Sequence, residues 1–281
     1  MITTESLTFW YSKQKRIFEK LNLELDAGHI YGLLGKNGAG KTTLLKLICG
    51  LSFPKSGTIA IDGLIPARRE PGFLVDIFFV PEEISLPSLT PKKFANIHCG
   101  FYPAFIPDIY SECLEKFEVD TDQNFSGMSY GQKKKTMIAF ALATNTRYLF
   151  LDEPTSGMDI PSKAAFRSMI AASFTEERTI ILSTHMVRDL ESLIDSVIIL
   201  ENRRIIMNRP LDQVAHKLTF GHSSISSFPG EMIYSSNSEL GPTIISLNPS
   251  GIPGNVDLEA LFNACINIPD KISSCFENKS F

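Results

Sequence analysis

The sequence predicts an α/β fold in which helices flank a parallel β-sheet. Three apolar runs support this class: residues 30–34 precede a glycine-rich loop and a helical pattern, residues 147–154 end in two acids, and residues 179–182 precede the polar triplet STH. Apolar strands that alternate with helical segments are typical of parallel sheets, which are buried on both faces. The carboxyl ends of such strands meet at one edge of the sheet, where doubly wound folds bind ligands.

The composition is that of an ordinary globular protein. The chain has 281 residues, of which 43% are hydrophobic, and a formal net charge of −4, so it can form one large domain and a small one. The main basic block is the triplet at 133–135, so we expect no nucleic-acid partner. No apolar run approaches the roughly 20 residues that span a bilayer, and the N-terminus lacks a signal peptide's apolar stretch. Five scattered cysteines without a CxxC pair indicate reduced thiols.

The strongest motif is HIYGLLGKNGAGKTTLLKLICGL, in which a strand, a glycine-rich loop and a helical pattern follow one another. Residues 35–42 fit the phosphate-loop pattern G-x-x-x-x-G-K-[ST]. Glycines let backbone N–H groups turn toward phosphate oxygens, and the helix N-terminus adds a partial positive charge. The predicted nucleotide-binding residues are Gly35, Asn37, Gly38, Ala39, Gly40, Lys41, Thr42 and Thr43.

The last residues of this loop have distinct expected roles. Lys41 should reach the β- and γ-phosphates, and the Thr42 hydroxyl should ligate Mg²⁺. Thr43 is a second phosphate donor. The alternative is a glycine-rich turn that matches the pattern by chance.

Two adjacent acids, Asp152 and Glu153, directly follow the apolar run in the segment RYLFLDEP. Successive strand residues point in opposite directions, so we expect the two carboxylates to have different roles. Asp152 suits the organisation of Mg²⁺ and its waters, and Glu153 suits the orientation and deprotonation of an attacking water. The alternative is a strand end with solvated acids.

A second polar helix start, MSYGQ, lies at residues 128–132. Taken alone, it is equally consistent with a Ser-capped helix over QKKKTMIAFALA. The apolar face of that helix would contain Met137, Ile138, Ala141 and Leu142.

Together these motifs resemble the nucleotide-binding subunit of an ATP-binding cassette (ABC) transporter, a P-loop NTPase, over about residues 1–210. MSYGQ takes the place of that family's LSGGQ signature. The resemblance implies ATP and Mg²⁺ as cofactors and a second ABC cassette, identical or different, that sandwiches two ATP molecules with this one. Ser129, Gly131 and the helix start at Gln132 would then face ATP held by the partner cassette.

The resemblance also assigns roles to three isolated residues. Tyr11, in FWYSKQKRIF, takes the place of the aromatic ring that stacks on adenine, with Trp10 or Phe9 as alternatives if the register slips. Asp159, in SGMD, would contact the opposite cassette. His185, in STH, would contact the γ-phosphate and the water-positioning glutamate.

The sequence departs from the family pattern at two places. Glu82, in FFVPEE, stands where a glutamine is expected; it can ligate Mg²⁺ through one oxygen but adds a charge. In the signature, Met128 and Tyr130 replace Leu and the first Gly, and a bulky Tyr130 restricts approach of the backbone to phosphate. We therefore hypothesise slower hydrolysis or a preference for a non-identical partner cassette.

The chain divides into an expected ABC ATPase domain, residues 1–210, and a small accessory region, residues 211–281. A helical subdomain is expected at about 83–140, and its aromatic residues either pack that subdomain or, with the Glu82 loop, form a groove for a cytoplasmic helix of a membrane subunit. The accessory region contains short strand-like pieces and a probable helix at VDLEALFNACI, without chemistry that its residues reveal.

The function predicted from the resemblance is ATP hydrolysis in an ABC transporter, most similar to bacterial exporters with a separate transmembrane permease. Such a subunit would be cytoplasmic and bound to the cytoplasmic face of the cell membrane through that permease. One alternative is a soluble ABC-type ATPase that acts on a protein assembly or nucleic acid, which the acidic balance and single cassette disfavour. The second alternative is a small-molecule kinase that uses the phosphate loop, but such an enzyme does not need the signature motif.

Overall fold

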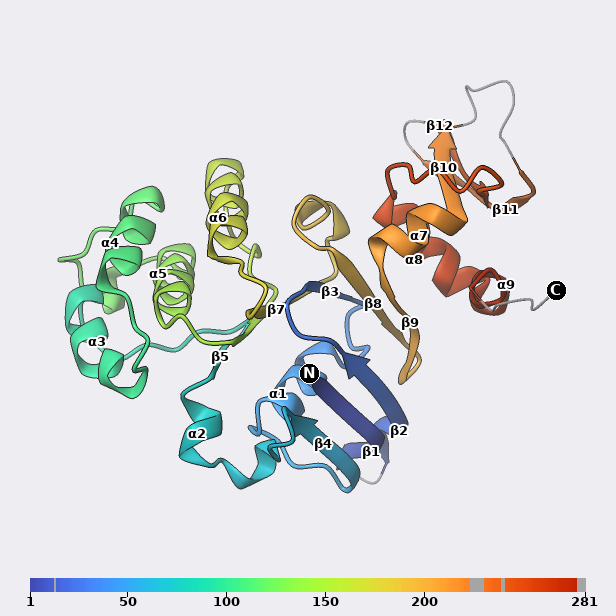
Figure 1. Cartoon of the computed structure of the whole chain (residues 1–281). Helices are drawn as coiled ribbons and strands as arrows, with labels where there is room; N and C mark the ends of the chain where they lie inside the picture. The colour runs from blue at the N-terminus through green and yellow to red at the C-terminus, as the bar shows by residue number, and fades with distance from the viewer. Residues whose placement is uncertain (13, 223–229, 239–240, 277–281) are drawn as a thin grey trace.

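A mixed six-stranded sheet forms the centre of the computed structural model, which describes residues 1–12, 14–222, 230–238 and 241–276 (Figure 1). Its strands are β3 (Ile30–Leu34), β5 (Ile77–Val80), β6 (Tyr148–Asp152), β7 (Thr179–Thr184), β8 (Ser196–Glu201) and β9 (Arg204–Pro210). They run in the order β5-β6-β7-β3-β8-β9, all parallel except β9, which pairs antiparallel with β8. The predicted α/β class with a parallel sheet is therefore confirmed.

The middle strands of this sheet are buried at every residue, as expected for parallel strands covered on both faces. Their register is aligned, with Leu34 opposite Thr184 and Asp152 opposite Ser183. The carboxyl ends of β3, β6 and β7 therefore lie side by side. This alignment brings the residues that follow each strand to one edge of the sheet.

A second, antiparallel sheet covers the helix that follows β3. It contains β1 (Ile2–Ser12), β2 (Lys15–Leu25) and β4 (Ser56–Ile61) in the order β2-β1-β4. Helix α1 (Lys41–Ile48) buries its leucines in one hydrophobic cluster with residues of this sheet, such as Leu7, and of the central sheet, such as Phe150. This packing on two sides fixes the position of the phosphate loop.

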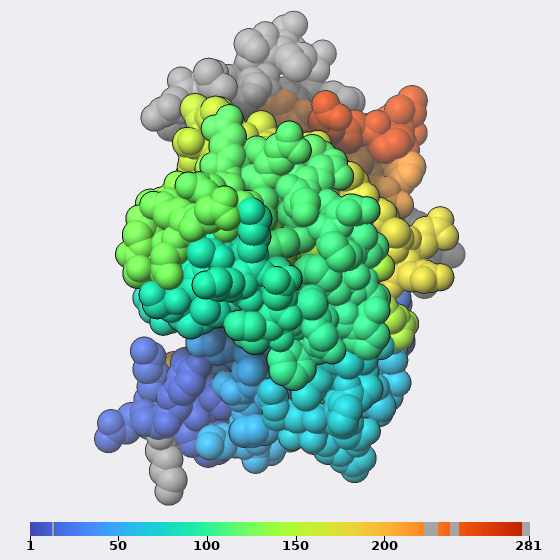
Figure 2. Space-filling model, turned by 90° about the vertical axis from the view of Figure 1, so that its left-hand side faces the viewer, coloured from blue at the N-terminus to red at the C-terminus, as the bar shows by residue number. Residues whose placement is uncertain are grey.

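The helices α3, α4 and α5 lie together on the left of Figure 1 and face the viewer in Figure 2, above the region of α2. The elements here are η1 (Pro66–Arg68), α2 (Pro71–Leu74), α3 (Pro91–His98), η2 (Cys99–Phe101), α4 (Pro107–Lys116), η3 (Phe125–Gly127) and α5 (Tyr130–Ala143). Phe140 of α5 is at the centre of an aromatic cluster, with ring centroids 5.2 Å from both Phe94 and Phe105. Most aromatic residues of the predicted helical insert therefore pack its interior.

The remaining elements follow β6 and extend to the C-terminal region. They are α6 (Ile160–Ser173), η4 (Val187–Asp189), α7 (Leu211–Lys217), β10 (Leu218–His222), β11 (Met232–Ser238), β12 (Gly241–Leu247), α8 (Leu258–Asn267) and α9 (Pro269–Ser274). The strands form a sheet of order β10-β12-β11. Helix α8 packs against β8 and η4, and Glu259 of α8 accepts a 2.6 Å hydrogen bond from Arg188 of η4. In the described ranges, none of the helices is long and apolar enough to cross a membrane.

Candidate functional site

The phosphate loop connects β3 to α1, and its backbone shape depends on glycine. Gly38 and Gly40 have φ values of +81° and +111°, which favour glycine. A side chain at Gly40 would also approach Ile17 and Phe18 at 3.0 Å. Gly40 is the N-cap of α1 and offers no side-chain cap to the first N–H groups of that helix. These N–H groups are thus available to an anion.

Lys41 and Thr42, the first residues of α1, connect this loop to the end of β6. Lys41 Nζ donates a 2.8 Å hydrogen bond to the Gly35 carbonyl and lies 3.6 Å from Glu153 Oε1. Thr42 Oγ1 donates a 2.6 Å hydrogen bond to Asp152 Oδ2. Residues predicted to bind phosphate and Mg²⁺ are therefore in direct contact, although Thr42 and Asp152 are 110 positions apart in the sequence.

Asp152 is completely buried, which makes its hydrogen bonds necessary. One carboxylate oxygen accepts from Thr42 and the other from the hydroxyl of Ser183, its partner on β7. A hydroxyl beside a carboxylate offers the hard oxygen ligands that Mg²⁺ prefers. The described residues contain no group of three or more His, Cys, Asp or Glu side chains that could hold a metal. The Thr42 hydroxyl and the Asp152 carboxylate fit Mg²⁺, which proteins usually bind through one or two carboxylates together with phosphate and water oxygens.

Glu153 follows the last residue of β6 and has a left-handed backbone, with φ +46°. Its N–H donates to the Ser183 carbonyl at 3.1 Å. Its carboxylate is 2.9 Å from His185 Nδ1 and accepts a 3.4 Å hydrogen bond from Thr184 Oγ1. From the sequence, the two carboxylates are expected to point apart because both residues are placed in one strand. That reason is wrong: the strand ends at Asp152, and the backbone turns at Glu153.

The aromatic residues near the loop differ in exposure. Tyr11 exposes 61% of its surface, whereas Phe9 is buried and Trp10 is half-buried. The Tyr11 hydroxyl lies 3.2 Å from Thr43 Oγ1, so its ring is next to the phosphate loop. Of the three adjacent rings, Tyr11 is therefore the one available to stack on a base.

The second polar helix start is a capping box. Ser129 Oγ accepts from the Gln132 N–H at 3.2 Å, and the Gln132 side chain accepts from the Ser129 N–H at 3.0 Å. The predicted helix start at Gln132 was wrong: the helix begins at Tyr130, because Ser129 is its N-cap. Ser129 is exposed and has no hydrogen bond to the described residues of its own phosphate loop. Gly131 lies against the Gly157 carbonyl, which a side chain would approach at 3.2 Å.

Two further predicted residues lie away from the loop. Asp159 is the exposed N-cap of α6, and hydrogen bonds from Ser162 lower the pKa of its carboxyl group. Glu82 follows β5 with an exposed side chain, and its carbonyl accepts a hydrogen bond from the Tyr130 hydroxyl. Among the described residues, no hydrogen bond joins the Glu82 carboxylate to Thr42 or Asp152.

The structure adds a residue that the sequence interpretation missed. Lys134 is fully buried, and its Nζ donates a 2.5 Å hydrogen bond to the Glu153 carbonyl. From the sequence, the basic triplet is placed in a Ser-capped helix and weighed as a nucleic-acid feature, but Lys134 is assigned no role at the site. Helical spacing was the available signal, because residue 134 is on the same face of α5 as Met137 and Ile138.

Comparisons with known proteins agree with this geometry. The family model described as "ABC transporter" matches residues 18–156. The bacitracin transport ATP-binding protein BcrA of Bacillus licheniformis is 32% identical over 219 residues, which cover 76% of this chain and 71% of that protein. The chain belongs to the ABC transporter family. It is an ATP-binding subunit of such a transporter and an ATPase, as the sequence predicted.

Other ABC transporter proteins extend the comparison. NatA of Bacillus subtilis, an ABC transporter ATP-binding protein, is 29% identical over 225 residues, which cover 76% of this chain and 91% of NatA. A solved ATP-binding subunit of an ABC transporter has a TM-score of 0.68 and 27% identity over 76% of this chain and 91% of its own. A dimeric bacterial ABC transporter cassette, with a TM-score of 0.66 and 21% identity, has the same fold over 75% of this chain and 98% of its own. The same cassette is also dimeric in a solved post-hydrolysis state bound to ADP and Pi.

Proposed function

We propose that this ABC subunit drives an exporter by closing on ATP with a second cassette and hydrolysing it with Glu153. The observation that carries the proposal is the convergence of Lys41, Asp152, Glu153 and His185 at one edge of the central sheet. Export is supported by the Nod factor export ATP-binding protein I of Neorhizobium galegae, which is 29% identical over 74% of this chain and 62% of its own length.

The residues at this edge divide the chemistry between them. Lys41 and the loop N–H groups bind the phosphates of ATP, and Tyr11 stacks on its base. Thr42 and Asp152 would hold Mg²⁺, and Glu82 is the further oxygen ligand that the family resemblance assigns. When bound, Mg²⁺ neutralises charge on the phosphates. Glu153 accepts the proton of the attacking water, and His185 orients the Glu153 carboxylate at 2.9 Å.

The signature acts on the partner cassette. Ser129 is exposed at the N-terminus of a 14-residue helix, where a hydroxyl and free N–H groups suit the γ-phosphate of ATP held by the other subunit. Gly131 keeps the adjacent backbone accessible, and the exposed Asp159 contacts the other cassette. Tyr130 and Glu82 remain departures from the family pattern, for which we predict slow hydrolysis by the isolated subunit or a non-identical partner cassette.

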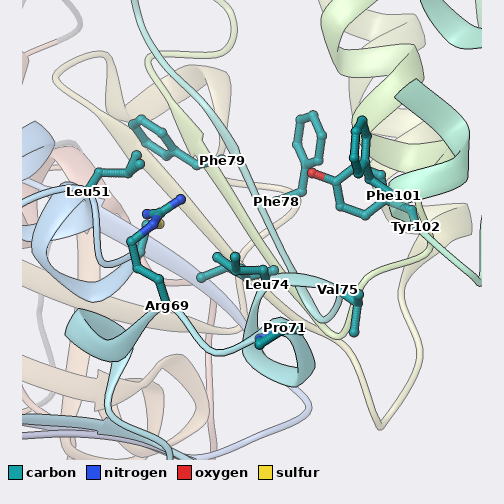
Figure 3. A pocket seen from close by; sticks show the side chains of 11 residues that line it. Leu51, Arg69, Pro71, Leu74, Val75, Phe78, Phe79, Phe101 and Tyr102 are labelled. Atoms are coloured by element: carbon teal, nitrogen blue, oxygen red, sulfur yellow. The ribbon is translucent and has the colours of Figure 1, made fainter. Parts of the chain in front are cut away.

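The permease docks at an apolar pocket between α2, β5 and η2. Its volume is about 510 Å³, and Figure 3 shows Leu74, Phe79 and Tyr102 among the side chains around it. Two of its lining residues, Phe101 and Leu51, are 67% and 50% exposed. An exposed apolar surface of this kind suits the insertion of a helix from a membrane subunit. The proposed place of the chain is thus the cytoplasmic face of the cell membrane.

The proposal also keeps the domain division expected from the sequence. Residues 1–210 form the ATPase domain with a helical subdomain at about 83–140, and residues 211–281 form an accessory region. Contacts such as Arg188–Glu259 support an accessory region that rests on the ATPase domain near η4.

Co-purification from the native membrane tests the proposal. The tagged full chain is isolated from detergent-solubilised membranes of its source, and the proteins that accompany it are identified by mass spectrometry. We expect a multi-spanning membrane protein, which the variant Phe101→Asp loses while it still binds ATP. The control Ile252→Asp changes a residue that is 74% exposed outside the pocket and should retain the partner. Recovery only in the soluble fraction, with a protein assembly or nucleic acid, would contradict the proposal.

A further inference from the structure

Lys134 is a fully buried cation in the second turn of α5. A buried ammonium group is costly unless polar groups surround it. Its Nζ donates a 2.5 Å hydrogen bond to the carbonyl of Glu153. Burial lowers the pKa of Lys134, and the nearby carboxylates of Glu82, Glu153 and Asp152 oppose that shift. The helix α5, whose N-cap is Ser129, thus places a charged side chain against the backbone of the proposed catalytic residue.

The backbone of Glu153 needs such support. A non-glycine residue with φ +46° persists only where its surroundings hold it in place. Ser183 holds the N–H of Glu153, through its carbonyl and hydroxyl oxygens, each at 3.1 Å. The Glu153 carbonyl accepts from Lys134 and, at 3.2 Å, from the Ser156 N–H. Of these contacting residues, only Lys134 belongs to α5, the signature helix, which begins within the signature MSYGQ.

Tyr130 completes a connection within the same helix. Lys134 Nζ lies 5.5 Å from the centre of the Tyr130 ring, a distance at which a cation and an aromatic face attract. The Tyr130 hydroxyl donates to the Glu82 carbonyl. The segment after β5, the start of α5 and the turn after β6 are therefore joined through two side chains of α5.

We propose that Lys134 is a positioning residue that couples the signature helix to Glu153 of the same chain. The inference rests on the proposed function, because it assumes that Glu153 activates water and that Ser129 faces the partner's nucleotide. A shift of α5 when Ser129 engages that nucleotide moves Lys134 Nζ, and Lys134 moves the Glu153 carbonyl. Nucleotide bound by the partner cassette and contacted by Ser129 thereby sets the geometry of the Glu153 carboxylate, which acts on the nucleotide bound by this chain.

Steady-state ATP turnover by the full chain tests the coupling. Lys134→Met keeps the length and apolar stem of the side chain but removes its donor and charge. We expect kcat to fall about 10- to 100-fold, because a shift of about 1 Å in a catalytic group can cost that much. The KM for ATP and the affinity for a fluorescent ATP analogue should stay within about twofold of the parent. Lys133→Met changes the neighbouring lysine of the same helix and should leave kcat unchanged.

A double-mutant cycle separates positioning from general stability. In the Glu153→Gln background, Lys134→Met should cause no further loss of kcat, because the group that Lys134 positions no longer reacts. Lys134→Gln, with a shorter polar side chain, is the second variant and should reproduce the kcat effect. Parent-like kcat in Lys134→Met, additive losses in the cycle, or loss of ATP binding and thermal stability in both Lys134 variants would overturn the inference.

The same cycle distinguishes this inference from the proposed function. If Glu153→Gln turns over like the parent, the assignment of Glu153 fails, and the coupling fails with it. If Glu153→Gln is inactive while Lys134→Met is fully active, the proposed function stands and the role of Lys134 alone is wrong.

Discussion

Thr42 Oγ1 donates a 2.6 Å hydrogen bond to Asp152 Oδ2 and so joins the phosphate loop to the end of β6. The two residues meet because β3 and β6 both flank β7 in register, which places their carboxyl ends at one edge. Ser183 fixes the other oxygen of the same carboxylate. The side chains of Thr42 and Asp152, the two proposed metal ligands, are therefore oriented by protein contacts alone, which reduces the cost of ordering them around an ion.

Asp152→Asn should weaken the response of the enzyme to Mg²⁺. The amide keeps the shape of the side chain but removes the negative charge that attracts a hard cation. We expect the Mg²⁺ concentration for half-maximal turnover to rise by about 10- to 100-fold. A Mg²⁺ titration of ATP turnover measures this shift. Asp122→Asn, whose side chain is 81% exposed, should titrate like the parent, and an unchanged midpoint in Asp152→Asn would refute the metal assignment.

Lys41→Ala should abolish ATP binding, whereas Lys36→Ala should preserve it. Both lysines belong to the phosphate loop and its helix start, but Lys41 is buried with its Nζ directed at the loop carbonyls, and Lys36 is 58% exposed beside Glu201. Loss of the buried cation removes the charge that meets the phosphates. Equilibrium binding of a fluorescent ATP analogue to the two variants measures the difference. Equal affinities would show that the loop binds ATP in another way.

Phe140→Ala should destabilise the helical region. The ring is 1% exposed and contacts the rings of Phe78, Phe94 and Phe105. Removal of a buried Phe side chain typically costs about 3–5 kcal/mol in the free energy of unfolding. Urea unfolding, monitored by circular dichroism, measures this change in the free energy of unfolding. Phe101→Ala, at a ring that is 67% exposed, should cost less than about 0.5 kcal/mol, and similar losses in both variants would contradict the central position of Phe140.

Local patterns in the sequence singled out most of the residues that the structure brings together at the candidate site. The strand, glycine loop and helix around Lys41 are consecutive, and the acids at 152 and 153 directly follow an apolar run, so each signal lies within a few residues. Their convergence follows from the topology of parallel sheets. The resemblance placed Tyr11 at the adenine, with Trp10 or Phe9 as alternatives; the greater exposure of Tyr11 depends on the packing of β1 against β2, which the local sequence does not give.

The remaining features depend on contacts between distant segments. The left-handed backbone of Glu153 is held by Ser183 and Lys134, which are 30 and 19 residues away. The link from Tyr130 to the Glu82 carbonyl crosses 48 residues. Helical spacing indicates that Lys134 is on the apolar face of α5, but nothing in the local sequence identifies the distant partner in either contact. The helix start at Tyr130 has a local signal, the capping-box pattern S-x-x-Q from Ser129 to Gln132, that the sequence analysis did not use.

Glu153→Gln is the most direct test of the account. The amide keeps the size and shape of the side chain but cannot accept the proton of the attacking water, so turnover should fall at least about 100-fold. ATP binding should persist, and size-exclusion chromatography with light scattering should detect an ATP-dependent dimer that Lys41→Ala does not form. Turnover equal to that of the parent, with no dimer in the presence of ATP, would contradict the assignment of Glu153 and the closure of two cassettes on ATP.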